Sequence, residues 1–113
     1  MTPEQRVHMT YEAFNERDES TALAGLAPDV HWDDGGGHML TDNQSIAGHW
    51  REQWQNADAK ILIDSMHWDG PELILLATLK TKNSDGTRAS RTIRNTLQFS
   101  GELISSMTIS MRE

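Results

Sequence analysis

Two polar residues on otherwise apolar strand faces are the residues of this sequence best suited to chemistry. Side chains alternate along a strand, so Asp34 shares a face with Trp32, and Asn95 shares the apolar face of a later strand with Leu97. A carboxylate in an apolar pocket has a raised pKa, which suits a general base. A nearby amide donor can stabilise a developing oxyanion. This pair of residue types is suited to removing a proton from a carbon next to a carbonyl group.

The same two residues also have a purely structural interpretation. Buried amides normally find hydrogen-bond partners, so Asn95 either bonds a backbone group or pairs with Asp34 in a structural network. The catalytic interpretation requires Asp34 to border a cavity. It fails if Asp34 faces bulk solvent or is fully held by Arg91.

Three glycines follow Asp34 at positions 35–37 and allow the backbone to bend sharply. No helix is expected directly after them and no lysine follows, so they do not form a phosphate loop. We expect this segment to form the rim of a pocket.

Composition excludes several classes of function. The 113 residues are the size of one domain, which we expect to span 1–113. A net charge of −7 argues against binding to nucleic acid or to anionic membranes. The absence of cysteine excludes disulfides and a thiol nucleophile, and the five histidines lack close ligand spacing, so we expect no metal and no cofactor. No secretory signal or membrane span is evident, which predicts a cytoplasmic protein.

Periodicity predicts helices in the first half of the chain and strands in the second. We expect helices over 3–17, over a short segment capped by Asp18 or Ser20 and ended by Pro28, and over about 42–55, with a strand from about 28 to 34 and then strands over 60–68, 72–82, 87–99 and 103–111. Short turns join the last four strands, which predicts an antiparallel meander. The fold class is therefore α+β, with helices on one face of the sheet.

Several segments together resemble one known family. They are YEAFNERD at 11–18, LAGLAPDV at 23–30, HWDD at 31–34, IAGHW at 46–50 and the closing pair of strands from Asn95 to Met107. In this pattern the chain resembles the NTF2-like superfamily, in its SnoaL-like and ketosteroid-isomerase-like branch. The resemblance covers nearly the whole chain. It implies a cone in which N-terminal helices pack on a strongly curved, mostly antiparallel sheet, commonly in a homodimer.

The resemblance also implies roles for individual residues. Asp34 matches the general base of ketosteroid isomerases, and Asn95 matches the protonated aspartic acid of their oxyanion hole. Thr10 matches the oxyanion tyrosine, with Tyr11 one position away. Because both oxyanion positions differ from the isomerases, the resemblance does not imply steroid isomerisation.

We therefore expect a small, cofactor-independent acid/base enzyme of the isomerase, cyclase or dehydratase type that acts on an apolar small molecule. Asp34 is the expected base, and Asn95 with either Tyr11 or Thr10 supplies the polarising donors. The expected substrate contacts are Thr10, Phe14, Trp32, His38, Trp50, Trp54, His67, Arg91 and Met107. The spacing of Trp50 and Trp54 also favours core packing. His8, His31 and His49 are expected at the surface. The alternative is a non-catalytic ligand-binding or dimerisation module of the same fold. A third possibility is an epoxide-hydrolase-like enzyme that uses Asp34, Arg91 and Asp64.

Overall fold

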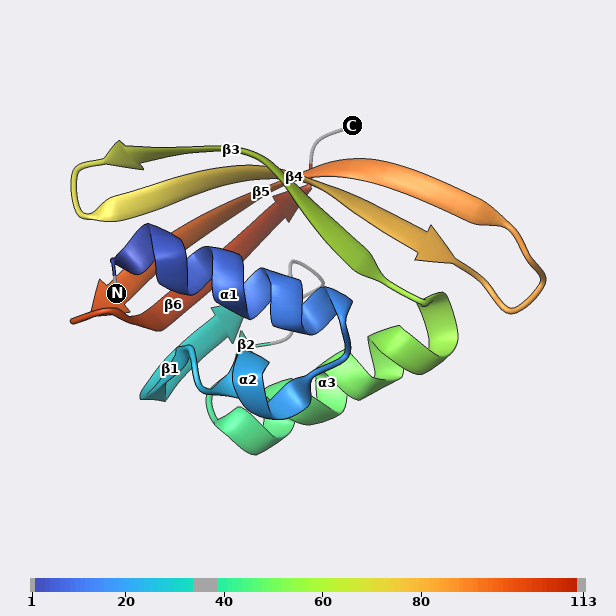
Figure 1. Ribbon diagram of the computed structural model, residues 1–113, viewed down its shortest axis with the longest axis horizontal. Helices are drawn as coiled ribbons and strands as arrows, with labels where there is room; N and C mark the ends of the chain where they lie inside the picture. Colours follow the sequence, from blue (N-terminus) through green and yellow to red (C-terminus); the bar gives the residue numbers. More distant parts are fainter. Residues whose placement is uncertain (1, 34–38, 112–113) are drawn as a thin grey trace.

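Three helices pack against one six-stranded sheet in the computed structural model, which describes residues 2–33 and 39–111 (Figure 1). The helices are α1 (Pro3–Asn15), α2 (Glu19–Leu23) and α3 (Asn43–Ala57). The strands are β1 (Leu26–Asp33), β2 (Met39–Leu40), β3 (Lys60–Asp69), β4 (Glu72–Lys82), β5 (Arg88–Ser100) and β6 (Leu103–Met111). No helix in these ranges is long and apolar enough to cross a membrane.

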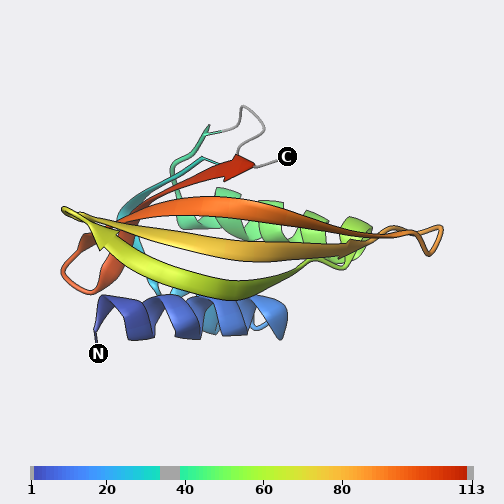
Figure 2. The same cartoon turned by 90° about the horizontal axis from the view of Figure 1, so that it is seen from above.

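The sheet has the strand order β2-β1-β6-β5-β4-β3 and curves around the helices (Figure 2). Every neighbouring pair is antiparallel except β1 and β6, which run parallel. The predicted α+β cone is therefore confirmed. The parallel pair was not predicted, because it depends on contacts between segments far apart in the chain. The short strand β2, which pairs with the nearby end of β1, was not predicted either.

The end of the second helix differs from the sequence prediction. The sequence predicts that Pro28 ends it, but α2 ends at Leu23 and Pro28 lies inside β1. A proline has no amide hydrogen for a strand ladder. The β1–β6 register shifts between Leu26 and His31, so Pro28 lies where the regular pairing is already interrupted.

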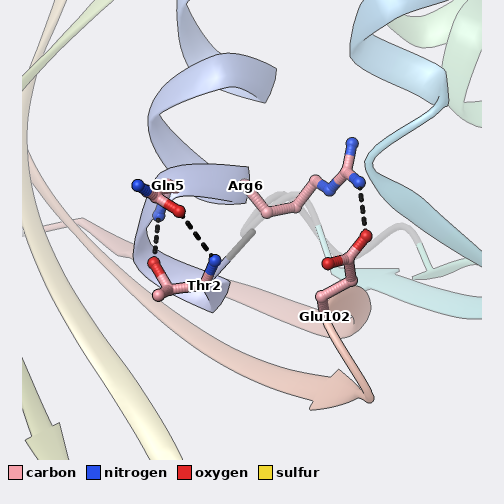
Figure 3. Close-up of polar contacts among 4 residues, drawn as sticks. All are labelled: Thr2, Gln5, Arg6 and Glu102. Carbon is pink, nitrogen blue, oxygen red and sulfur yellow. Dashed lines mark hydrogen bonds and ion pairs between the residues drawn. The ribbon is translucent and has the colours of Figure 1, made fainter.

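Capping residues fix where the helices begin. The Thr2 amide donates to Gln5 Oε1 at 2.8 Å and the Gln5 amide donates to Thr2 Oγ1 at 3.1 Å, a reciprocal capping box at the start of α1 (Figure 3). Asp18 and Asp42 cap α2 and α3 without this reciprocity, because one carboxylate oxygen of each accepts from a backbone amide, that of Thr21 and that of Ser45, respectively.

Asn15 joins the end of α1 to the edge of the sheet. Its Nδ2 donates to the Ile61 carbonyl at 2.8 Å, and its Oδ1 accepts from the Ile61 amide at 2.7 Å. Because β3 is an edge strand, these backbone groups have no neighbouring strand to pair with. One side chain thus satisfies both and holds α1 over the inner face of the sheet.

The Arg6–Glu102 ion pair gives a prediction for the pH dependence of stability. Arg6 Nη2 lies 2.7 Å from Glu102 Oε1 and links α1 to the β5–β6 turn, with the arginine side chain only 14% exposed (Figure 3). The hydrogen bond from Arg6 lowers the pKa of Glu102. A carboxyl with a lowered folded-state pKa stabilises the fold above its unfolded-state pKa, and this contribution is lost as the pH falls through the folded-state value.

We therefore expect Glu102→Gln to lower the melting temperature at neutral pH. The difference from wild type should shrink below about pH 4, where the carboxylate is protonated in both states. Glu52→Gln on the exposed face of α3 is the control and should leave the melting temperature nearly unchanged. A Glu102→Gln deficit of the same size at every pH would contradict the assignment to this ion pair.

Candidate ligand pocket

A cavity lies between the helices and the inner face of the sheet. Its volume is about 50 Å³, or about 560 Å³ of empty space when the open mouth is counted. It is lined by Thr10, Tyr11, Phe14, Trp32, His49, Trp50, Gln53, Ile61, Leu79, Ile93 and Ile109. A buried water needs about 10–15 Å³ of such space, so the inner part holds a few waters or a small ligand group.

Aromatic rings form one wall of the cavity. Trp50 packs edge-on against Phe14 and Trp32, with ring centroids 5.9 and 5.5 Å away, and is 2% exposed. Trp54 lies behind them, 5.4 Å from the Phe14 ring, and does not line the cavity. The tryptophan stripe of α3 therefore serves as core packing, and Trp50 also serves as cavity wall.

Tyr11 and Asn95 form a buried polar pair at this cavity. Asn95 Nδ2 donates to Tyr11 Oη at 2.5 Å, and the two residues are 1% and 4% exposed, respectively. Because the hydroxyl oxygen accepts this bond, the phenol hydrogen is available to donate. Burial raises the pKa of Tyr11 well above its ordinary value, more strongly than the hydrogen bond from Asn95 lowers it. The hydroxyl is therefore neutral and a donor at physiological pH.

The sheet explains why Asn95 is held so firmly. It lies on β5 directly opposite Leu75 of β4 and Ile109 of β6. Asn95 Oδ1 and Thr10 Oγ1 are buried and have no hydrogen-bond partner among residues 2–33 and 39–111. Buried polar atoms without a partner cost free energy of folding. Together they give this end of the apolar cavity a polar character.

His49 and Gln53 of α3 line the cavity, although the sequence predicted His49 at the surface. Together with Ile46, Trp50 and Trp54 they follow the i, i+3, i+4, i+7, i+8 spacing of a buried helix face. This spacing was the signal that would have identified them. The apolar members of the stripe alone do not reveal these two polar residues.

Besides Trp54, three more of the expected contact residues lie away from the cavity. A bulge between Ile63 and Ser65 shifts the register of β3, so His67 pairs with Ile74 on the outer face and is exposed. Arg91 is exposed and lines a separate groove near the β4–β5 turn. Met107 is buried in the core and does not line the cavity.

Asp64 also lies away from the cavity, exposed, with one carboxylate oxygen accepting from Thr78 Oγ1 at 2.9 Å. Asp64 and Arg91 therefore do not line the cavity, although the epoxide-hydrolase-like set requires it.

Asp34 and His38 lie outside the described residues. Trp32, the neighbour that shares the predicted face of Asp34, is 6% exposed and lines the cavity, while His31 is exposed.

The curved sheet, the covering helices and the apolar cavity are those of an NTF2-like cone. A family model described as the SnoaL-like domain matches residues 7–107, and the chain belongs to this family. No curated protein matches the sequence.

Solved structures share the fold at low sequence identity. An NTF2-like protein of unknown function from Burkholderia pseudomallei K96243 is 22% identical, with a TM-score of 0.88 over 99% of this chain and 92% of that one. A hypothetical protein with a ketosteroid-isomerase-like fold from Catenulispora acidiphila DSM 44928, in complex with trimethylamine, is 18% identical, with a TM-score of 0.85 over 97% and 86%. An LEH-like epoxide hydrolase from M. tuberculosis is 15% identical, with a TM-score of 0.82 over 96% and 80%.

Proposed function

We propose that this protein is a cofactor-independent acid/base enzyme that removes a proton next to the carbonyl group of an apolar small molecule. The observation that carries the proposal is the neutral Tyr11 hydroxyl, which lines an aromatic-walled cavity with its hydrogen free to donate. A donor held in a low-dielectric site stabilises the negative charge that develops on a carbonyl oxygen.

Each residue has a distinct role in this reaction. Asp34 takes the proton from the carbon next to the carbonyl, so the C–H electron pair forms an enolate. Tyr11 donates a hydrogen bond to the enolate oxygen, and Asn95 orients Tyr11. Return of the proton to another carbon gives an isomer. Attack by the enolate carbon on a second carbonyl carbon of the same molecule, whose π electron pair moves to its oxygen and takes the proton from Asp34, gives a cyclised product. The apolar wall selects the substrate by burying its hydrocarbon part.

Deuterium exchange tests this proposal without knowledge of the natural substrate. A panel of apolar ketones is incubated in deuterated buffer, and mass spectrometry measures deuterium uptake next to the carbonyl. Wild type should accelerate uptake for at least one ketone, and Asp34→Asn, which cannot accept the proton, should abolish this acceleration. Asp33→Asn, on the residue directly before it, is the control and should retain it.

The second candidate is a non-catalytic binding module, since the same apolar cavity also fits binding alone. It predicts that a ketone quenches the fluorescence of Trp32 and Trp50 while no exchange occurs. That result, or equal exchange by wild type and Asp34→Asn, would contradict the enzymatic proposal.

A further inference from the structure

A groove on the outer face of the sheet is lined by basic residues from three strands. Lys60 of β3, Lys80 and Lys82 of β4 and Arg88 of β5 line this cationic groove, whose volume is about 500 Å³. All four side chains are exposed. They include all three lysines of a chain whose net charge is −7. Positive charge is therefore concentrated at one place on an otherwise acidic protein.

The strand register forces these cations against one another. Lys60 pairs with Lys80 across β3 and β4, and Lys82 pairs with Arg88 across β4 and β5. Lys80 and Lys82 are two residues apart on β4, so both pairs lie on one face of the sheet. Leu79 directly precedes Lys80 and lines the cavity, so Lys80 and Lys82 lie on the opposite, outer face of the sheet. Like charges directly opposite each other destabilise a sheet, and this groove contains two such pairs.

No described acidic residue forms an ion pair with these four cations. Asp58 lines the groove but forms an ion pair with Arg17. Asp85, in the β4–β5 turn, accepts hydrogen bonds from the amide and hydroxyl groups of Thr87. Within residues 2–33 and 39–111, none of the four basic side chains of the groove forms an ion pair or a hydrogen bond.

The dipole of α3 accounts for only one of these cations. Lys60 follows the carboxyl end of α3, where a positive charge is favourable. Lys82 and Arg88, however, pair at the end of the β4–β5 hairpin, and this hairpin projects beyond α3 in both views (Figures 1 and 2). The repulsion between Lys82 and Arg88 would be offset by a negatively charged ligand.

We propose that the cationic groove binds a small molecule that carries a phosphate-type dianion, such as a phosphate monoester or a pyrophosphate. The two cation pairs are two residues apart along the strands, roughly 7 Å, so one compact dianion lies within reach of both. At physiological ionic strength charges act over about 8 Å, so a small anion in the groove interacts mainly with these four cations. A nucleic acid or an anionic membrane would also meet the acidic remainder of the surface. This site is independent of the reaction proposed for the cavity.

Titration of the full chain with inorganic pyrophosphate, followed by amide NMR, tests this proposal. We expect the largest shift changes in residues 58–62 and 80–90, with binding that weakens as salt is added. Lys80→Gln with Lys82→Gln should weaken binding by about tenfold or more, because two of the four attracting charges are removed. The control Arg51→Gln with Arg94→Gln changes the net charge equally but away from the groove, and should change the affinity by less than about twofold.

Three outcomes would overturn the proposal. In the first, pyrophosphate at millimolar concentration leaves these amides unshifted. In the second, both double variants weaken binding equally, which indicates only general charge attraction. In the third, the protein binds vesicles with phosphate-monoester headgroups but neither free pyrophosphate nor a soluble phosphate monoester. The groove would then bind a lipid surface and not a small molecule. The deuterium exchange of the Lys80→Gln, Lys82→Gln variant, measured in parallel, should equal that of wild type.

Discussion

Replacing Tyr11 by phenylalanine should slow ligand deuterium exchange by about 10²–10³-fold, the effect of removing one oxyanion donor. The ring remains in the cavity wall, so apolar contacts with the ligand persist, but the hydroxyl hydrogen that faces the developing charge is lost. The rate at saturating ketone should therefore fall more than the apparent affinity.

This variant needs a stability control, because Tyr11→Phe leaves the Asn95 amide without its partner. A buried donor left unpaired costs about 1–3 kcal/mol, so unfolding by urea should be measured alongside the exchange rate. Phe14→Leu, in the same wall, provides a comparison that changes the cavity but removes no donor. An exchange rate for Tyr11→Phe within about twofold of wild type would contradict the donor role.

Replacing Trp50 by alanine should lower the free energy of unfolding by about 3–5 kcal/mol. Trp50 is 2% exposed and packs on three aromatic rings, so its removal leaves a large hole that opens into the pocket. Trp68→Ala is the matched control, since Trp68 is 44% exposed, and it should cost about 1 kcal/mol or less. Urea unfolding measures both values.

Indole provides a second readout of the same hole. A ligand that binds only the folded state raises its stability, so added indole should restore part of the lost stability of Trp50→Ala and none for Trp68→Ala. Equal losses in the two variants, without rescue, would mean that Trp50 does not form the centre of the core.

The local parts of this fold could be predicted from the sequence. The first helix was predicted from residue 3, where α1 begins, and the alternation along β5 placed Asn95 among apolar residues, where the structure has it. Such signals lie within a few residues of the position they determine. They were sufficient for the helices, the long strands and the α+β class.

Features that depend on strand register could not be predicted in this way. The bulge in β3 reverses which face His67 occupies, and nothing in the alternation of Lys60 to Trp68 reveals it. The parallel pairing of β1 with β6 depends on contacts across most of the chain. The direct bond between Asn95 and Tyr11 likewise required the structure, since the sequence left open whether Asn95 bonds a backbone group or pairs with Asp34.

The central claim is that the cavity stabilises negative charge on a ligand oxygen beside Tyr11. The most direct test is the absorbance spectrum of 4-nitrophenol bound to Asp34→Asn, a variant that mimics the uncharged state of the base after it has taken a proton. We predict that the bound ligand absorbs as the phenolate at a pH where free 4-nitrophenol is mostly neutral, and that adding Tyr11→Phe reverses this shift. Binding as the neutral phenol, with the same spectrum in both variants, would contradict the claim.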